Sequence, residues 1–211
     1  EIEVEEQPTG SISAGVGVGS SGSAVSTAIA EKNLFGKGVG LSGNISLGTE
    51  KISGTVNLSI PDFKNTDNKF NFSLYALETD FTNSGYESKV VGSSISTTFE
   101  IYDDFFLNVG GGFDIDKISA NDSATALYRS REGTYNSLQT FYAVNFDKRN
   151  NIFFPTDGHL IQFGQNLSLP GVSDISIIRN NLNGSVYHAL TDDYVINLKG
   201  GITAVNTFDN K

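Results

Sequence analysis

Apolar and polar residues alternate along most of this chain, in short runs separated by turns. In the clearest run, 51–60, apolar residues recur at every second position from Ile52 to Ile60, and the positions between them are polar. Because successive side chains of a strand point to opposite sides, a period of two predicts an extended strand whose faces meet different environments. Eleven such runs fill almost the whole sequence, with no clear helical period between them. They cover residues 10–20, 24–31, 38–48, 51–60, 68–80, 87–101, 105–117, 137–147, 158–169, 175–190 and 193–205.

Most of the predicted strands are long enough to cross a lipid bilayer, which takes about 9–11 residues in a tilted strand. The turns after the even-numbered strands lie at the end of the sheet where the chain enters, and aromatic residues cluster near them. That position is typical of the aromatic girdle of a membrane barrel. The aromatic residues concerned are Phe35, Phe63, Tyr102, Phe105, Phe153, Phe154 and Tyr194.

Two connections are predicted to have structure of their own. The longest, 118–136, falls at the opposite end of the sheet and is expected to contain a short helix around 124–131. Thr156 and Asp157 suit a type I turn, with Gly158 in the left-handed conformation that closes the hairpin.

The composition of the polar faces favours a membrane barrel over a soluble β-sandwich or barrel. Charged residues make up 18% of the chain, below the roughly 25% of soluble domains, and Ser, Thr, Asn and Gly supply most of the polar positions. Alternation alone does not separate the two folds, because a period of two is the same whichever face is buried. The net charge of −10 argues against a nucleic-acid partner. The chain contains no Cys, which excludes disulfide and thiol chemistry.

Three motifs that suggest chemistry have simpler interpretations. Residues 17–22 match G-x-G-x-x-G, but no acidic residue follows about 20 positions later and no strand–helix alternation continues. His159 and His188 are isolated and lack the spacing of a zinc site, so we expect no metal, no cofactor and no enzymatic activity. Asp114 and Asp116 share one face of a strand, where a solvated lumen wall is a simpler explanation than ion selection.

Several turns resemble those of the BamA-type outer-membrane β-barrel assembly factors. Residues 33–38 resemble the family's N-x-x-G-x-G turn after the second barrel strand, and residues 61–63 resemble its P-x-F turn after the fourth. Residues 169–171 fall where the family has a Pro-Gly loop, and residues 5–10 are similar to the junction between the last POTRA domain and the first strand. The most specific match is the D-x-R … P-T-D-G turn between strands 8 and 9, formed here by Asp147, Arg149, Pro155, Thr156, Asp157 and Gly158.

The resemblance implies an all-β, antiparallel, up-and-down transmembrane β-barrel, present here as an incomplete barrel of about 11 strands. An odd count agrees with this, because single-chain bacterial barrels have even numbers of strands. Residues 1–9 would end a preceding periplasmic POTRA-like domain or linker, residues 10–211 would form the N-terminal portion of the barrel, and further strands beyond residue 211 would complete it. The implied location is the bacterial outer membrane. The implied partners are the lipid bilayer, unfolded β-barrel client proteins and periplasmic assembly lipoproteins.

The first predicted strand indicates how such a barrel would act. Each unsatisfied backbone group in lipid costs several kcal/mol, so an insertase needs a sheet edge that can open and pair with a client strand. Residues 10–19 are small and Gly-rich, which suits a lateral gate, although they also suit an ordinary glycine-tolerant wall strand. The alternatives are a two-partner-secretion or TamA-type transporter of the same superfamily, a passive outer-membrane pore, and a soluble ligand-binding β-domain. The residues predicted to bind a client strand are Ser11, Ile12, Ser13, Ala14, Gly15, Val16, Gly17 and Val18.

Overall fold

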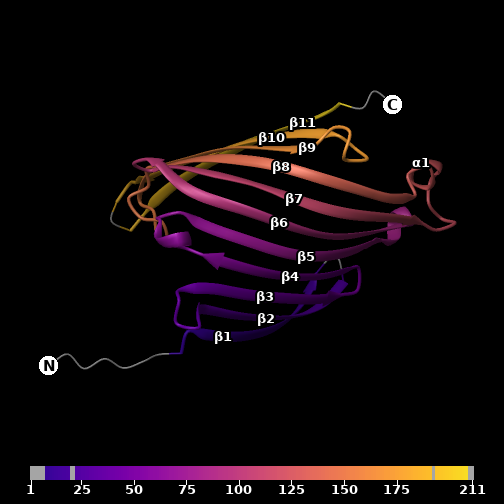
Figure 1. Cartoon of the computed structure of the whole chain (residues 1–211), viewed down its shortest axis with the longest axis horizontal. Helices are drawn as coiled ribbons and strands as arrows, with labels where there is room; N and C mark the ends of the chain where they lie inside the picture. The colour runs from indigo at the N-terminus through magenta and orange to yellow at the C-terminus, as the bar shows by residue number, and fades with distance from the viewer. Residues whose placement is uncertain (1–7, 20–21, 192, 209–211) are drawn as a thin grey trace.

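The chain forms one curved antiparallel sheet of eleven strands, seen in the computed structural model of Figure 1. The structure describes residues 8–19, 22–191 and 193–208. Each strand pairs only with its neighbours in the sequence, so the sheet is the predicted up-and-down meander, with β1 and β11 at its two edges. The strands are β1 (Gly10–Gly19), β2 (Gly22–Leu34), β3 (Val39–Gly48), β4 (Lys51–Ile60), β5 (Lys69–Phe81), β6 (Tyr86–Tyr102), β7 (Phe105–Ala120), β8 (Gly133–Asp147), β9 (Asp157–Ser168), β10 (Ile177–Ala189) and β11 (Val195–Thr207).

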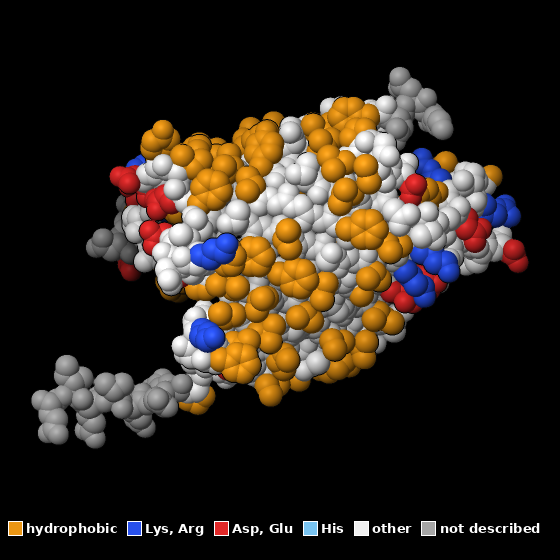
Figure 2. Space-filling model, in the orientation of Figure 1, with side chains coloured by type: hydrophobic (Ala, Val, Ile, Leu, Met, Phe, Trp, Pro, Cys, Tyr) orange, Lys and Arg blue, Asp and Glu red, His pale blue; other side chains and the backbone are white. Residues whose placement is uncertain are grey.

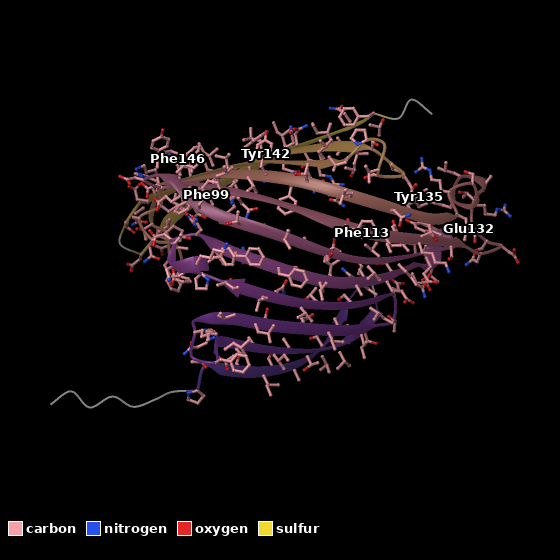
Figure 3. All side chains as sticks on the ribbon, viewed as in Figure 1. Phe99, Phe113, Glu132, Tyr135, Tyr142 and Phe146 are labelled. Carbon is pink, nitrogen blue, oxygen red and sulfur yellow. The ribbon has the colours of Figure 1, made fainter. Side chains whose placement is uncertain are left out.

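The pairing register collects apolar side chains on one face of the sheet and polar side chains on the other. One row of cross-strand neighbours on the apolar face contains Leu41, Leu58, Phe72 and Ile95. The adjacent row on the polar face contains Ser42, Asn57, Ser73 and Ser94. Figure 2 looks onto the apolar face, where hydrophobic side chains cover the middle and charged side chains gather at the two ends. Figure 3 shows Phe99, Phe113 and Tyr142 projecting from this face.

Neither face of the sheet is packed into a core. Among the residues that the structure describes, Ala124 is the one buried hydrophobic side chain. The accessible surface is 14759 Å², whereas a compact monomer of this mass exposes about 9,500 Å². Val56 and Leu198, which a soluble fold would pack inside, are 48% and 70% exposed. The apolar face therefore needs a non-aqueous environment, and the soluble sandwich is not the fold.

The observed strand ends lie within four residues of the predicted ones, and the largest difference is in the connection between β7 and β8. The connection after β7 spans 121–132 instead of 118–136, because β7 and β8 remain paired with their neighbours further than the alternation indicated. Its helix, α1 (Ala126–Arg129), lies inside the predicted range. Two further single-turn 3-10 helices, η1 (Phe63–Asn65) and η2 (Thr82–Ser84), follow β4 and β5.

The predicted tight turn at Thr156 and Asp157 is wrong. Asp157 already belongs to β9, and the β8–β9 connection is a longer loop, 148–156. Gly158 does have the predicted positive φ, 97°, but it lies within the strand, where a Cβ would collide with the Lys148 carbonyl oxygen.

The predicted domain end at residues 1–9 falls mostly outside the described residues, since residues 1–7 are not among them. Within the described part of the chain, no helix is long and apolar enough to cross a membrane.

Candidate functional site

The strand β1 forms an open edge of the sheet. All ten of its residues are exposed, with Ile12, Val16 and Val18 more than four-fifths exposed. It pairs with β2 along one side, and no described strand lies along the other. The predicted client-binding residues therefore lie together on one accessible strand.

The hydrogen-bond pattern shows which backbone groups of β1 are free. The Lys32 N–H donates to the Thr9 carbonyl oxygen (3.3 Å), and on the far side of β2 the Thr49 N–H donates to the Ser23 carbonyl oxygen (3.1 Å). Bonded and non-bonded pairs alternate in an antiparallel ladder, so every second residue of β1 after Thr9 bonds to β2. Among the predicted client-binding residues 11–18, the bonded ones are Ser11, Ser13, Gly15 and Gly17. The residues whose N–H and C=O groups face the open edge are Ile12, Ala14, Val16 and Val18.

The four residues with free backbone groups carry their side chains on the apolar face. Ile12 lies opposite Ile29, and Val16 lies opposite Val25. The eight predicted residues thus form two alternating groups. The residues of one group direct their backbone N–H and C=O groups to the open edge, and those of the other bond to β2 and carry their side chains on the polar face.

Side chains add little to the attachment of β1. A Cβ added at Gly17 or Gly19 would meet no atom within 4 Å. Among the described residues, one side-chain hydrogen bond reaches the strand, from the Thr27 hydroxyl to the Ser13 carbonyl oxygen at 3.2 Å. The backbone ladder with β2 is therefore the main attachment of this strand.

The D-x-R part of the β8–β9 turn forms the least exposed ion pair of the described chain. The Arg149 guanidinium donates from Nε to Asp147 Oδ1 (2.8 Å) and from Nη2 to Oδ2 (2.7 Å), and the side chains are 14% and 20% exposed. Such a two-point contact is stronger and more directional than a single one. These hydrogen bonds raise the pKa of Arg149 above its ordinary value.

The P-T-D-G part of the turn is organised by Asn150, which the sequence motif does not include. Its Oδ1 accepts from the backbone N–H groups of Thr156 (3.0 Å) and Asp157 (3.1 Å), and its Nδ2 donates to Thr156 Oγ1 (2.6 Å). Asn commonly bonds to nearby backbone groups in loops, which was the available signal. The six predicted turn residues therefore act in two parts, the Asp147–Arg149 pair and the segment held by Asn150.

A polar network crosses the middle of the sheet on the face opposite the apolar one. Asp114 accepts hydrogen bonds from the Tyr75 hydroxyl and from Gln139 Nε2, and Asn166 Nδ2 donates to Gln139 Oε1 at 2.9 Å. The contact between β5 and β7 passes over Gly92 of β6, where a Cβ would collide with both partners. Asp114 thus lies on the predicted lumen face, engaged by two donors.

The second predicted lumen aspartate is also engaged. Asp116 accepts from the Ser88 hydroxyl at 2.9 Å. Across the described residues, no group of three or more His, Cys, Asp or Glu side chains is arranged to hold a metal ion.

Comparison with known proteins decides the family. Residues 33–210 match the family model of the Omp85 superfamily domain. The chain belongs to the Omp85 superfamily. This Omp85 chain is 26% identical over 216 residues to the outer membrane protein assembly factor BamA of Neorickettsia risticii (strain Illinois). The aligned region covers 93% of the chain and 27% of the relative.

A solved structure agrees in fold with this Omp85 chain. The crystal structure of BamA from Haemophilus ducreyi lacking POTRA domains 1-3 superposes with a TM-score of 0.80 at 24% identity, covering 97% of the chain and 42% of that structure. The chain therefore spans well under two thirds of both relatives. The predicted family, the partial up-and-down barrel and the bacterial outer-membrane location are confirmed.

Membership in the Omp85 superfamily also explains the two faces of the sheet. The apolar face meets lipid, and the polar face with Asp114 lines the lumen, as in other membrane barrels. The charged side chains at the two ends of the apolar band, among them Lys89 with Glu78 and Glu87, then lie at the borders of the hydrocarbon layer.

Proposed function

We propose that this chain is the N-terminal part of a barrel that assembles and inserts β-barrel proteins into the bacterial outer membrane, with β1 as its lateral gate. The observation that carries the proposal is the weak side-chain attachment of β1 to β2, together with the backbone N–H and C=O groups of Ile12, Ala14, Val16 and Val18, which are not bonded to β2. The name of the BamA relative supports the same role.

The edge would act by lending its hydrogen bonds to a client strand. In lipid an unpaired backbone group costs several kcal/mol, so a client strand that enters the bilayer needs a partner at once. Pairing with β1 would satisfy its backbone by β-augmentation. No covalent bond is made or broken in this step, so no catalytic residue is required.

The weak attachment of β1 suits repeated exchange. In a closed barrel the same edge would pair with the terminal strand, and a client would replace that strand. Because Gly17 and Gly19 have open space around them, an incoming strand meets few side chains that must move. The Asp147–Arg149 turn lies at the end of β8, far from β1 in the strand order, and we assign it a structural role.

Partners follow from the same proposal. The lipid bilayer covers the apolar face, unfolded β-barrel proteins pair with β1, and periplasmic lipoproteins together with the POTRA domains deliver them. A TamA-type or two-partner-secretion transporter would share the fold, and a passive pore would keep β1 permanently paired.

Disulfide crosslinking tests the gate directly in the complete barrel, made free of any Cys outside residues 1–211; residues 1–211 contain none. A single Cys introduced at any of residues 11–18 should form disulfide adducts with a Cys in the last strand of an arrested client. A Cys on the lumen face of β1 should crosslink mainly to client residues on the lumen face, and a Cys on the lipid face mainly to client residues on the lipid face. The matched control is Ser93→Cys in β6, which has a strand on either side and should give no adduct. Adducts absent from β1, or equally frequent at Ser93→Cys, contradict the gate.

A further inference from the structure

The strand β8 continues beyond the end of its neighbour β9. It pairs with β7 from Gly133 onward, but with β9 only from Gln139 onward, which lies opposite Ser168. Residues 133–138, the outer end of β8, therefore have a strand on one side only. Figure 1 shows this end of β8 extending past the orange connection between β9 and β10. An unpaired strand edge of this kind is a ready site for pairing with another chain.

The backbone groups on the unpaired side belong to even-numbered residues. At the other end of β8, the Asp147 N–H donates to the carbonyl oxygen of Asp104, which precedes β7 (2.9 Å). The next N–H, that of Lys148, donates to the carbonyl oxygen of His159 in β9 (2.8 Å). Because these directions alternate along a strand, Asn136 and Leu138 direct their N–H and C=O groups to the side where β9 has ended.

The β9–β10 connection, residues 169–176, occupies the groups of both residues. Asp174 Oδ2 accepts from the Asn136 N–H (2.5 Å), and the Asp174 N–H donates to the Asn136 carbonyl oxygen (2.9 Å). The Ser173 hydroxyl oxygen accepts from the Leu138 N–H (3.0 Å) and lies 3.1 Å from the Leu138 carbonyl oxygen. That carbonyl also accepts from the Leu169 N–H (2.8 Å). Two loop residues thus bond to the edge as a neighbouring strand would.

The connection is folded back onto β8 and fixed at both ends. Its turn is closed by the Ser173 N–H, which donates to the Leu169 carbonyl oxygen (3.0 Å). The buried polar side chains of the described chain are Ser168 (4% exposed) and Ser176 (2%), one at each end of the connection. The Ser176 carbonyl oxygen also accepts from the Phe208 N–H (3.0 Å). The contact with β8 is therefore a built feature of the sheet.

The cap differs from a strand in its dependence on side chains. A strand pairs through backbone groups alone, whatever its sequence, whereas the Asn136 and Leu138 N–H groups are held here by a carboxylate and a hydroxyl. Residues 133–138 span about 20 Å, which is the length of an ordinary strand. An extended segment that offers both N–H and C=O groups would therefore compete with the cap for the same edge.

The outer end of β8 is also accessible from outside the barrel. Thr134 and Asn136 lie on the same face of the strand as Leu138, and both are polar and exposed. The apolar face thus becomes polar at this end of β8. A segment dissolved in water can reach the edge here without entering lipid.

We infer that the outer end of β8 is a second strand-accepting edge, and that Ser173 and Asp174 are an intramolecular cap that keeps it closed. With the cap displaced, the edge would take one extended peptide segment by β-augmentation. This inference is independent of the proposed gate, because it concerns neither β1 nor a client strand in the bilayer.

Residue-resolved hydrogen exchange in the complete barrel tests the cap. Asp174→Ala removes the acceptor of the Asn136 N–H, and its exchange should become about tenfold faster, the value of a hydrogen bond to a charged group. Asp174→Asn is the matched control, because its amide oxygen can still accept and should keep most of the protection. The N–H groups of Tyr135 and Ser137, which face β7, should exchange at the wild-type rate in both variants.

A peptide probe tests whether the uncapped edge accepts a strand. The probe is a short synthetic peptide of alternating Thr and Val residues with one Cys, and the barrel carries Thr134→Cys as its single Cys. Disulfide adducts should rise about tenfold when Ser173→Ala and Asp174→Ala are added, because the cap no longer competes. The same peptide with N-methylated backbone groups lacks the donors and should give few adducts. Ser93→Cys in β6, which has a strand on either side, should give none.

Each measurement has an outcome that overturns the inference. Unchanged exchange of the Asn136 N–H in Asp174→Ala shows that the side chain does not cap the edge. Faster exchange without peptide adducts, or adducts equally frequent with the N-methylated peptide, shows that the edge does not accept a strand. Missing client adducts at β1 count against the gate alone and leave these results unaffected.

Discussion

The β1 edge and the β5–β9 wall belong to one sheet but are held in different ways. The wall is crosslinked on its lumen face by the chain of side chains from Tyr75 through Asp114 and Gln139 to Asn166. At β1, within the described part of the chain, one side-chain hydrogen bond is made, from the Thr27 hydroxyl to the Ser13 carbonyl oxygen. The strand β1 also has one backbone ladder, with β2, whereas each strand of the wall has two. Both differences favour opening at β1 rather than within the wall.

The largest effect is expected from the same substitution made in the two regions. Gly92→Ala places a methyl group against Asp114 and Tyr75, and overpacking of this kind costs about 1–3 kcal/mol. Gly17→Ala has no atom within 4 Å of the new methyl group and should leave stability nearly unchanged. Urea unfolding of the reconstituted protein, followed by heat-modifiable gel migration, measures both. An equal loss of stability in the two variants would contradict the difference in packing between the wall and the β1 edge.

Removing the centre of the network should come next. Asp114→Ala leaves the Tyr75 hydroxyl and the Gln139 amide without their common acceptor, and hydrogen bonds to a charged group contribute about 1.5–3 kcal/mol. Water in the lumen can bond to the freed hydroxyl and amide groups, so we expect the free energy of unfolding to fall by about 1.5 kcal/mol, the lower of these values. The control is Ser13→Ala in β1, because the Ser13 side chain makes no hydrogen bond to any described residue; this variant should unfold at the wild-type urea concentration.

Proline substitutions separate the two groups of β1 residues. The Val16 N–H faces the open edge, so Val16→Pro should keep the β2 ladder and lower client crosslinking by about five- to tenfold, the value of about one hydrogen bond. Gly15→Pro removes an N–H that bonds to β2 and should detach the strand, which limited proteolysis would detect. If the two variants behave alike, the assigned alternation along β1 is incorrect.

The smallest effect is expected at the exposed ion pair between Lys148 and Asp104. Their hydrogen bond raises the pKa of Lys148, but both side chains are nearly half exposed, and surface pairs contribute little. Lys148→Ala should therefore leave the unfolding midpoint within experimental error. Arg149→Lys, which loses the two-point contact with Asp147, should lower it measurably.

Local patterns were sufficient for most of the fold. The strand around Ile52 and Val56 was predicted with its final boundaries, because its alternation depends only on residues next to each other in sequence. The helix near Ala126 was also found. The type I turn predicted at Thr156 and Asp157 is wrong, because the conformation there depends on contacts with Asn150, six residues before Thr156 in the chain.

The sequence by itself determined the strands, the apolar face and the family, since alternation and turn motifs are properties of neighbouring residues. Only the tertiary structure decided which backbone groups of β1 are free, because that depends on the register with β2. It also decided that Tyr75 meets Asp114, two strands away, because the intervening Gly92 leaves room for the contact. Contacts of this kind depend on distance in space, and alternation along one strand carries no information about them.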